Sequence, residues 1–416
     1  MKRIKALFRE KDERSGDGEG TLLSLTRAKG IVPQTEASNR IASTEDLSKY
    51  KVCRPGDLVM NRMQAWSGMF ALSSIEGVVS PDYSVFGSIG SADVKYFEHL
   101  FKTPLLVDQF AQRSKGIGSG FNRLYTPDFG AVPVVVPPLP EQAAIVRYLD
   151  YVDRRIRRYI RAKQKLIGLL EELKAAIIHR AVTRGLPAAA AAQAGLDPNV
   201  RIKHSGVEWL GEVPEHWGVV SLGMAVDSIQ TGPFGSQLHA SEYVTGGIPI
   251  INPCHLRDGR IESDPAISVS QQKTRKLIRH QLYAGDIVAA RRGELGRCAL
   301  VTDSEAGWLC GTGSLRIRPK AQVFNSAYLL VVFGSQGVRD TLSLSSIGAT
   351  MDNLNSGMVA RLRLPCPPLC EQKAIMVSIA SETATIHTAS HITRREVELL
   401  REYRTRLIAD VVTGKL

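Results

Sequence analysis

The sequence lacks the features that mark membrane-spanning and secreted proteins. It contains no run of about 18 apolar residues, which is the length that a membrane-spanning helix needs. Its opening stretch, MKRIKALFREKDERSG, is charged and includes no apolar segment long enough for a secretory signal peptide. We therefore expect no association with a membrane and a location in the cytoplasm.

Catalytic motifs are also missing. The sequence has no G-x-x-x-x-G-K-[ST] nucleotide loop, no H-E-x-x-H zinc motif and no G-x-S-x-G nucleophile turn. The stretch INPCH (251–255) shares only part of the N-P-P-aromatic loop of adenine methyltransferases, because it lacks the second proline and the stacking aromatic. We expect that the chain is not an enzyme and holds no catalytic residues.

Cysteine is scarce and is not arranged for metal binding. None of the six cysteines forms a C-x-x-C pair, and Cys366 and Cys370 lie four positions apart without a second cluster. This usage is typical of reduced thiols in a cytoplasmic protein and predicts no metal site.

What is abundant is positive charge. The chain of 416 residues carries 53 Lys and Arg against 41 Asp and Glu, for a net charge of +12. Such a balance favours an anionic partner, and nucleic acid comes before an acidic membrane surface. The length predicts two to three domains, and a hydrophobic content of 44% is sufficient for each to bury a core.

An internal repeat organises the sequence. The segment PPLPEQAAIV (137–146) returns 230 positions later as PPLCEQKAIM (367–376). Further matched segments lie at nearly the same offset: AVTRGL (181–186) with VVTGKL (411–416), RPGDLVMNRM (54–63) with YAGDIVAARR (283–292), and Leu124 with Leu354. The chain is therefore predicted to hold two copies of one plan, in which a mixed domain is followed by a two-proline stop and a long helix.

The two copies begin differently. The second has a lead-in, SGVEWLGEVPEHWGVVSL (205–222), whereas the first begins at MKRIKALF, which aligns with the stretch just after Trp217. Two explanations stay open: the first domain tolerates the loss of the lead-in, or the true start lies upstream.

Each two-proline stop precedes a heptad pattern. In the series that starts at Ile145, nine of eleven positions at three- and four-residue spacing are apolar, and in the series from Ile375 seven of eleven are apolar. The prolines mark the helix boundaries, and Glu141 and Glu371 fall in the first turns, where negative charge suits the helix dipole. Packing the two seams on each other as an antiparallel pair is the simplest way to bury both.

The first helix is long and basic. From about Glu141 to Thr183 it would extend roughly 65 Å at ~1.5 Å per residue, enough to hold two DNA-reading domains one or two turns of ~34 Å apart. Its segment RRIRRYIRAKQK (154–165) has seven Lys or Arg and no acid. This segment is either an ordinary solvated face or a source of sequence-independent affinity for phosphates.

Together these segments resemble the specificity (S) subunit of type I restriction-modification systems, over nearly the whole chain. PPLPEQAAIVRYLD and PPLCEQKAIM, each followed by a helix, look like the spacer regions of that family. SGVEWLGEVPEHW looks like its entry into a target recognition domain, and RPGDLVMNRM and GVVSPDYSVF (77–86) resemble strands of the first such domain. The missing lead-in of the first copy departs from the pattern.

The repeat and the resemblance predict an α+β fold with an internal pseudo-two-fold repeat. Two mixed α/β target recognition domains are expected to be separated by two long helices packed as an antiparallel coiled coil. The predicted parts are recognition domain 1 (1–136), spacer helix 1 (137–185), a linker (186–205), recognition domain 2 (206–366) and spacer helix 2 (367–416).

The resemblance implies a non-catalytic reader of double-stranded DNA. Each recognition domain would read one half of a bipartite target, and the helices would set the spacing and dock two modification subunits. S-adenosylmethionine is expected on the modification (methyltransferase) subunits, with no cofactor on this chain, and a restriction (motor-nuclease) subunit would join the complex.

Base readout in the major groove needs Arg, Lys, Asn or Gln on exposed loops. The predicted DNA-binding residues are Arg62, Lys115, Asn122, Arg123, Arg291, Arg292 and Asn353. Ordinary surface solvation explains each of them equally well, and base contacts cannot be separated from phosphate contacts at this level.

Two other functions would make different demands on the sequence. A fused methyltransferase or nuclease would need a cofactor loop and a catalytic motif, and neither occurs. A coiled-coil interaction or scaffold protein without sequence-specific DNA binding is the alternative, against which the basic balance and the duplicated mixed domains argue.

Overall fold

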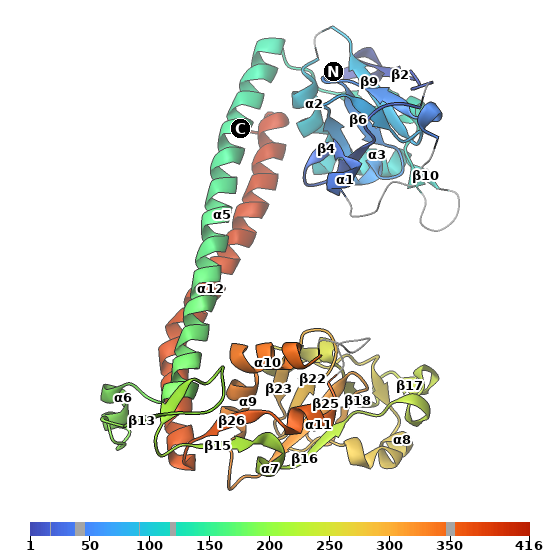
Figure 1. Cartoon of the computed structure of the whole chain (residues 1–416). Coiled ribbons are helices and arrows are strands. Elements are labelled where there is room, and N and C mark those ends of the chain that lie inside the picture. The colour runs from blue at the N-terminus through green and yellow to red at the C-terminus, as the bar shows by residue number, and fades with distance from the viewer. Residues whose placement is uncertain (17, 38–45, 91, 117–121, 347–353) are drawn as a thin grey trace. The chain divides into compact units, whose positions relative to one another are not determined.

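The computed structural model describes the whole chain except residues 17, 38–45, 91, 117–121 and 347–353. It divides into two compact units, one formed by Met1–Lys165 with Arg394–Leu416 and the other by Leu166–Thr393. Each unit combines sheets with helices (Figure 1). Two long helices, α5 (Leu139–Arg184) and α12 (Leu369–Val412), each contribute one end to each unit.

The first unit is built on an antiparallel sheet with the strand order β2-β9-β6-β7. These strands are β2 (Phe8–Lys11), β9 (Tyr83–Ser88), β6 (Leu58–Asn61) and β7 (Phe70–Leu72). Four two-stranded pairs accompany it: β1 (Lys2–Arg3) with β12 (Pro133–Val134), β3 (Leu23–Thr26) with β4 (Gly30–Pro33), β5 (Lys51–Cys53) with β8 (Gly77–Val79), and β10 (Lys115–Gly116) with β11 (Asn122–Arg123). Its short helices are α1 (Gln34–Ala37), α2 (Val94–Phe101), α3 (Pro104–Arg113) and α4 (Thr126–Ala131).

Phenylalanine dominates the core of the first unit. Neighbouring phenylalanine rings lie 5.1–5.9 Å apart between centroids, as aromatic pairs prefer. The rings belong to Phe8, Phe70, Phe86, Phe97, Phe101, Phe110 and Phe129. Leu149 from the first turns of α5 and Val411 from the last turns of α12 pack against this cluster. The helix ends are therefore part of the first unit's core.

The second unit contains an antiparallel sheet of the order β16-β25-β22-β23. Its strands are β16 (Val226–Thr231), β25 (Ser314–Pro319), β22 (Ile287–Ala290) and β23 (Cys298–Leu300). A second sheet has the order β17-β21-β18-β24, formed by β17 (Tyr243–Val244), β21 (Ser268–Val269), β18 (Ile248–Ile251) and β24 (Leu309–Cys310). Three pairs complete the strands: β13 (Ile202–His204) with β14 (Glu212–Pro214), β15 (Gly218–Ser221) with β26 (Arg363–Cys366), and β19 (Leu256–Arg257) with β20 (Arg260–Ile261).

Short helices accompany the second unit's sheets. They are α6 (Ala188–Gln193), α7 (Leu222–Ala225), α8 (Gln271–Lys276), α9 (Ser326–Phe333), α10 (Gln336–Ser346) and α11 (Ser356–Ala360). The core contains Trp217, Val182 from the end of α5 and Ile375 from the start of α12.

The central strands of both sheets are apolar on both faces. In β6, Leu58 faces the aromatic core while Val59 belongs to a separate cluster. In β22, Ile287 faces the main core while Val288 belongs to a separate cluster. This explains why RPGDLVM and YAGDIVA read as continuous apolar runs after the GD pair, since each strand is covered on two sides.

The repeated Glu-Gln pair has a structural role that is the same in both units. Gln142 and Gln372 are fully buried, and each side-chain amide donates to the carbonyl of the first proline of its stop, Pro137 at 2.8 Å and Pro367 at 2.9 Å. Each side-chain oxygen accepts from the backbone N–H of a helix N-cap residue, Asp93 of α2 at 2.9 Å and Asn325 of α9 at 2.8 Å. One buried residue thus ties each long helix to its mixed domain.

The GD turns also match. Asp57 accepts from the backbone N–H of Arg54 and Asp286 from that of Tyr283, both at 2.9 Å. Each buried carboxylate is neutralised by a cation from another strand of the sheet, Lys11 of β2 at 2.6 Å in the first unit and Arg318 of β25 at 2.8 Å in the second. The glycines before them have φ of +93° and +90°, a conformation that side chains rarely adopt.

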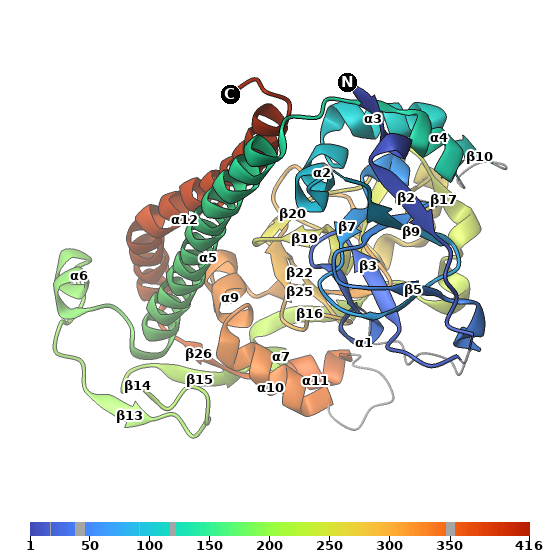
Figure 2. The ribbon, with the colours of Figure 1, turned by 90° about the horizontal axis from the view of Figure 1, so that it is seen from above.

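Within each unit, α5 and α12 lie side by side (Figures 1 and 2). In the first unit Lys163 pairs with Glu396 at 2.7 Å, and Asp153 pairs with Arg404. In the second unit Arg180 pairs with Glu382 at 2.7 Å, and Ser390 donates to Glu171 at 3.3 Å. In both units higher numbers on α5 meet lower numbers on α12, so the two helices run antiparallel there.

The predicted apolar seams are buried only in part. Ile156 and Ile386 are 5% and 8% exposed. The prediction that the whole series is buried is wrong for Tyr159, Leu166, Leu173 and Tyr403, which are 43–53% exposed.

No helix of the described residues is long and apolar enough to cross a membrane.

We expect Gln142→Ala and Gln372→Ala each to lower the free energy of unfolding by about 1–3 kcal/mol, because buried backbone groups lose their partners. Urea denaturation followed by circular dichroism measures the change. Gln164→Ala is the matched control, because Gln164 is an exposed glutamine on α5. Unfolding midpoints equal to that of the control would contradict the assigned role.

Candidate nucleic-acid interface

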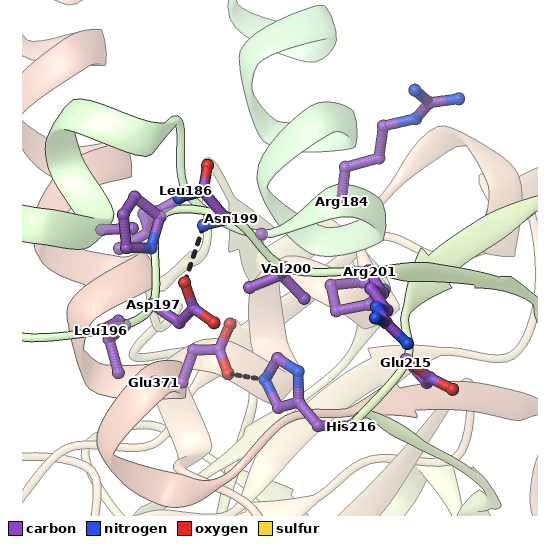
Figure 3. A pocket seen from close by; sticks show the side chains of 14 residues that line it. Arg184, Leu186, Leu196, Asp197, Asn199, Val200, Arg201, Glu215, His216 and Glu371 are labelled. Atoms are coloured by element: carbon purple, nitrogen blue, oxygen red, sulfur yellow. Dashed lines mark hydrogen bonds and ion pairs between the residues drawn. The ribbon is translucent and has the colours of Figure 1, made fainter.

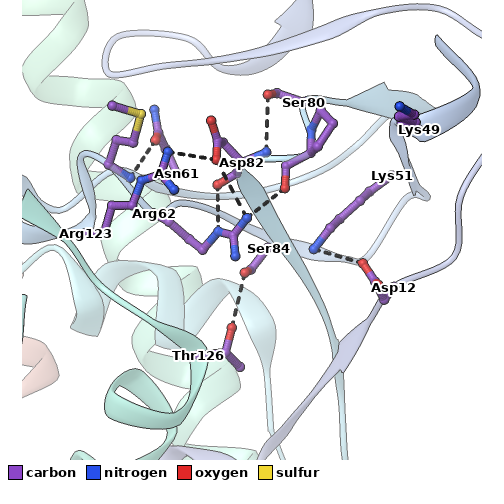
Figure 4. Close-up of polar contacts among 12 residues, drawn as sticks. Asp12, Lys49, Lys51, Asn61, Arg62, Ser80, Asp82, Ser84, Arg123 and Thr126 are labelled. Carbon is purple, nitrogen blue, oxygen red and sulfur yellow. Dashed lines mark hydrogen bonds and ion pairs between the residues drawn. The ribbon is translucent and has the colours of Figure 1, made fainter. Parts of the chain in front are cut away.

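Two of the predicted DNA-binding residues meet around one turn of the first unit (Figure 4). Arg62 donates to the backbone oxygens of Asp82 at 2.9 Å and Pro81 at 2.8 Å. Arg123 pairs with the carboxylate of Asp82 at 3.1 Å. The guanidinium of Arg62 therefore fixes the turn that leads into β9, and Arg123 is held beside it.

The remaining predictions in the first unit lie on the small β10–β11 pair. Lys115 and Asn122 are exposed, and the ammonium of Lys115 lies 3.1 Å from the carboxylate of Asp128. Lys115 faces Arg123 across the pair. These side chains form a polar, partly basic edge that a DNA backbone can approach.

In the second unit the neighbouring arginines have different environments. Arg291 donates from Nε to the backbone oxygen of Leu354 at 3.0 Å, and burial lowers the pKa of its guanidinium. Arg292 is exposed. Asn353 lies outside the described residues. Arg292 is thus free to contact a ligand, whereas Arg291 supports the backbone.

The same backbone hydrogen bond between a leucine and an arginine, called here the arginine–leucine closure, occurs in both units. Leu124 donates its N–H to the oxygen of Arg62 at 3.0 Å, and Leu354 donates to the oxygen of Arg291 at 2.9 Å. The leucines and arginines are the residues that the sequence repeat matches to within one position. The closure fixes the same loop base in each unit.

Sequence analysis missed a second basic segment. Residues 271–280, QQKTRKLIRH, form α8 and a 3-10 turn, η7 (Ile278–His280). Arg275, Lys276 and Arg279 are exposed, and in the described part of the chain none of them forms an ion pair. Its sequence signal is four Lys or Arg within seven positions and no acid, a shorter basic run than that of α5.

The basic run of α5 is partly neutralised. Arg157 pairs with Asp153 at 2.6 Å, and the guanidinium of Arg155 stacks over Tyr151 at 5.6 Å from the ring centre. Four further cations are exposed and show no ion pair among the described residues. They are Arg154, Arg158, Arg161 and Lys165, whose spacing of four, three and four places them on one helix face. This face is open to an anionic partner, and both interpretations of the run still stand.

Known proteins show what this architecture is similar to. Residues 214–391 match the family profile of the type I restriction modification DNA specificity domain. The MjaVIII specificity subunit of Methanocaldococcus jannaschii, a type I restriction enzyme, is 24% identical over 324 residues, or 76% of this chain and 70% of that protein. The EcoKI specificity subunit of Escherichia coli K12 is 21% identical over 213 residues, or 50% of this chain and 44% of that protein.

The fold is similar as well. A solved chain, from work on the complex assembly and conformational transition of the type I R-M system, superposes with a TM-score of 0.70 and 18% identity. The alignment covers 100% of this chain and 97% of that one. The second half of the chain thus matches the specificity-domain profile, and most of the chain is similar to specificity subunits of type I restriction enzymes.

The part of the chain that the profile matches includes a buried carboxylate site (Figure 3). Glu371, in the first turn of α12, accepts from the indole N–H of Trp217 at 3.0 Å and lies 2.7 Å from Nε2 of His216. A cavity of about 620 Å³ adjoins it, lined mainly by residues 184–201 and 214–216. Gly185 lies so close that a Cβ there would be 3.3 Å from the Trp217 ring. The lead-in is thereby fixed to the start of α12.

The site offers no metal-binding chemistry. No group of three or more His, Cys, Asp or Glu that could hold a metal occurs among the residues that the structure describes. All six cysteines are free, and burial raises the pKa of Cys298 and Cys310 to about 12, which leaves these thiols unreactive.

Arg291→Gln and Arg292→Gln should distinguish a residue that supports the protein backbone from one that contacts DNA. Arg291→Gln is expected to lower thermal stability, by about 1 kcal/mol in free energy, because the Leu354 carbonyl loses a charged donor. Arg292→Gln should leave stability unchanged and weaken DNA binding. Differential scanning calorimetry and fluorescence anisotropy measure the two effects, and a stable Arg291→Gln protein would refute the supporting role.

Glu371→Ala is expected to destabilise the protein by about 1–3 kcal/mol, because the buried Trp217 indole N–H is left without an acceptor. Glu141→Ala is its control, since Glu141 occupies the equivalent helix position and is exposed. Chemical denaturation of both variants measures the difference. Equal effects of the two substitutions would show that the indole bond contributes nothing.

Proposed function

We propose that this chain is the non-catalytic DNA-specificity subunit of a type I restriction-modification complex. Each mixed domain reads one half of a bipartite target in double-stranded DNA. The observation that carries the proposal is that one specificity-domain architecture occurs twice. The profile covers the second copy, and the first copy shares its sheet order, its buried glutamine and its arginine–leucine closure.

The two copies are related by an internal pseudo-two-fold repeat, and their helices form an antiparallel coiled coil. The support for the coiled coil is that polar members of the two seams meet each other, Lys163 with Glu396 and Arg180 with Glu382. When the charged positions of two apolar seams form oppositely charged pairs, the helices favour pairing with each other in one register. The coiled coil sets the distance between the half-sites that the recognition domains contact.

The two recognition surfaces differ because the repeat preserves the frame, meaning the buried glutamine, the GD turn and the arginine–leucine closure. It does not preserve the exposed residues. In the first domain we assign DNA contact to Lys115, Asn122 and Arg123, and in the second to Arg292 and Asn353. Arg62 and Arg291 hold the backbone that presents these residues. Different residues at equivalent positions give two different half-sites, and hence an asymmetric target.

The chemistry resides on partners. Two modification subunits dock on the helices, bind S-adenosylmethionine and methylate adenine, and a motor-nuclease subunit joins them for restriction. The exposed aromatic residues of α5, among them Tyr148, Tyr151 and Tyr159, suit such docking because aromatic side chains are enriched at protein interfaces. The complex acts on DNA in the cytoplasm.

Modified-base sequencing tests the proposal. The host genome is sequenced with the gene intact and with it deleted, and loss of an adenine mark at one split motif is expected. Arg123→Ala or Arg292→Ala should then relax recognition of one half of that motif and leave the other half unchanged. An unchanged methylome in cells that express the chain with its modification subunit would overturn the proposal in favour of a DNA-independent scaffold.

A further inference from the structure

An exposed aromatic residue is held on a tightly anchored loop of the second recognition domain. After β16 the chain passes through Gly232, whose N–H donates to Ser314 at 3.0 Å and where a Cβ would lie 1.8 Å from the Gly311 oxygen. The loop ends at Leu238, which is buried in a small cluster with Leu277. Between these anchors Phe234 is 60% exposed. Its ring is therefore presented to solvent by a fixed backbone.

The loop is joined to the basic segment that follows α8. His280 Nδ1 lies 2.9 Å from the oxygen of Thr231, the last residue of β16. On the same segment Ile278 is 59% exposed. Two apolar side chains thus project from segments that a hydrogen bond and a shared cluster hold together.

Positive charge accompanies Ile278 on its segment. Arg275, Lys276 and Arg279 are exposed next to Ile278. The buried Arg316 of β25, which pairs with Asp286, donates to the backbone oxygens of Arg279 at 3.2 Å and Gln281 at 2.6 Å and so anchors the segment. Glu242, the acid that contacts α8, is neutralised by Lys273 at 2.6 Å.

We propose that the loop around Phe234 and the segment 275–279 form a DNA-deforming surface. Arg275, Lys276 and Arg279 bind phosphates, and Phe234 presses against a base step from the minor groove. This inference rests on the proposed function and adds a mode of recognition to it. Proteins that bend DNA combine apolar wedges with Arg and Lys in this way. A protein partner would account for the exposed ring but less well for the three cations of the segment, because charged residues are depleted at the cores of protein interfaces.

We expect the DNA deformation only in the half-site that the second recognition domain contacts. In the first domain the strand equivalent to β16 is β2, and the residues that follow it are Asp12 and Glu13, engaged with Lys51 and Arg54. That position has ion pairs where the second domain has an exposed ring. At this position the first domain therefore offers no wedge.

The test uses the full chain assembled with its modification subunits and a duplex that carries the target found by methylome sequencing. 2-Aminopurine replaces single adenines other than those methylated. We expect fluorescence to rise in the second half-site on binding, and Phe234→Ala to abolish this rise while affinity falls on the order of tenfold, as unstacking contacts are lost. The first half-site should be unaffected.

Three variants complete the design. Met224→Ala removes another exposed apolar residue of the same unit and should leave both signals unchanged. Phe234→Leu keeps an apolar wedge and should retain part of the fluorescence rise. The triple variant Arg275→Gln, Lys276→Gln, Arg279→Gln should reduce the slope of log K against log salt by up to about 2.7.

The outcomes separate the two proposals. If the wild-type complex does not distinguish the target from a scrambled duplex, the proposed function itself fails. If it does, but Phe234→Ala and the triple variant match wild type in fluorescence and salt slope, the surface does not contact DNA and the inference is overturned. Loss of modification subunits from either variant, with DNA contacts intact, overturns it in favour of a protein interface.

Discussion

The rest of the structure depends on one buried side-chain amide that is used twice. Gln142 and Gln372 each bond a proline carbonyl just before a long helix and the N-cap of a short helix in the adjoining domain. A primary amide suits this position because it donates on one side and accepts on the other. A buried polar group of this kind is stable only when both bonds are made, so it specifies a single geometry. Each long helix therefore leaves its domain in a defined direction.

A fixed frame leaves the exposed residues free to differ. The glutamine, the GD turn and the arginine–leucine closure have counterparts in both units, and all three lie in the interior or bond the backbone. The basic segment 271–280 and the ring of Phe234 are on the surface of one unit, whereas the first unit presents Lys115 and Arg123. Selection on a DNA target can change such residues at little cost in stability, because surface substitutions usually have small effects.

Sequence analysis predicted the frame well for a physical reason. The spacing of PPLPEQ, the heptad series and the GD segments reflects local rules of helix initiation and strand burial, which can be read from a single sequence. The family profile and the two long helices agree with these predictions. The same rules indicated that Glu371 opens a helix, but could not show that Trp217, 154 positions earlier, donates to it.

The predicted DNA contacts were less accessible to sequence reasoning. Arg62 and Arg291 carry the residue type that reads bases, yet their guanidinium groups bond backbone oxygens of the protein. An arginine's partner depends on which carbonyls the fold leaves unpaired, and this is settled only in three dimensions. Arg292, Lys115 and Asn122 are exposed, and their contact with DNA stays a prediction; Lys115 already pairs with Asp128.

The polar exceptions in the helix seams show how register is fixed. Surface ion pairs such as Lys163–Glu396 and Arg180–Glu382 contribute little to stability, about 0–1 kcal/mol each. They disfavour other alignments of the two helices, because moving α12 along α5 by one turn would place each charge opposite a different residue. One pair lies in each unit, so a slip in either unit is opposed locally. A more apolar seam would tolerate several registers. A protein that must hold two domains at a fixed distance therefore gains more from ion pairs that allow only one register.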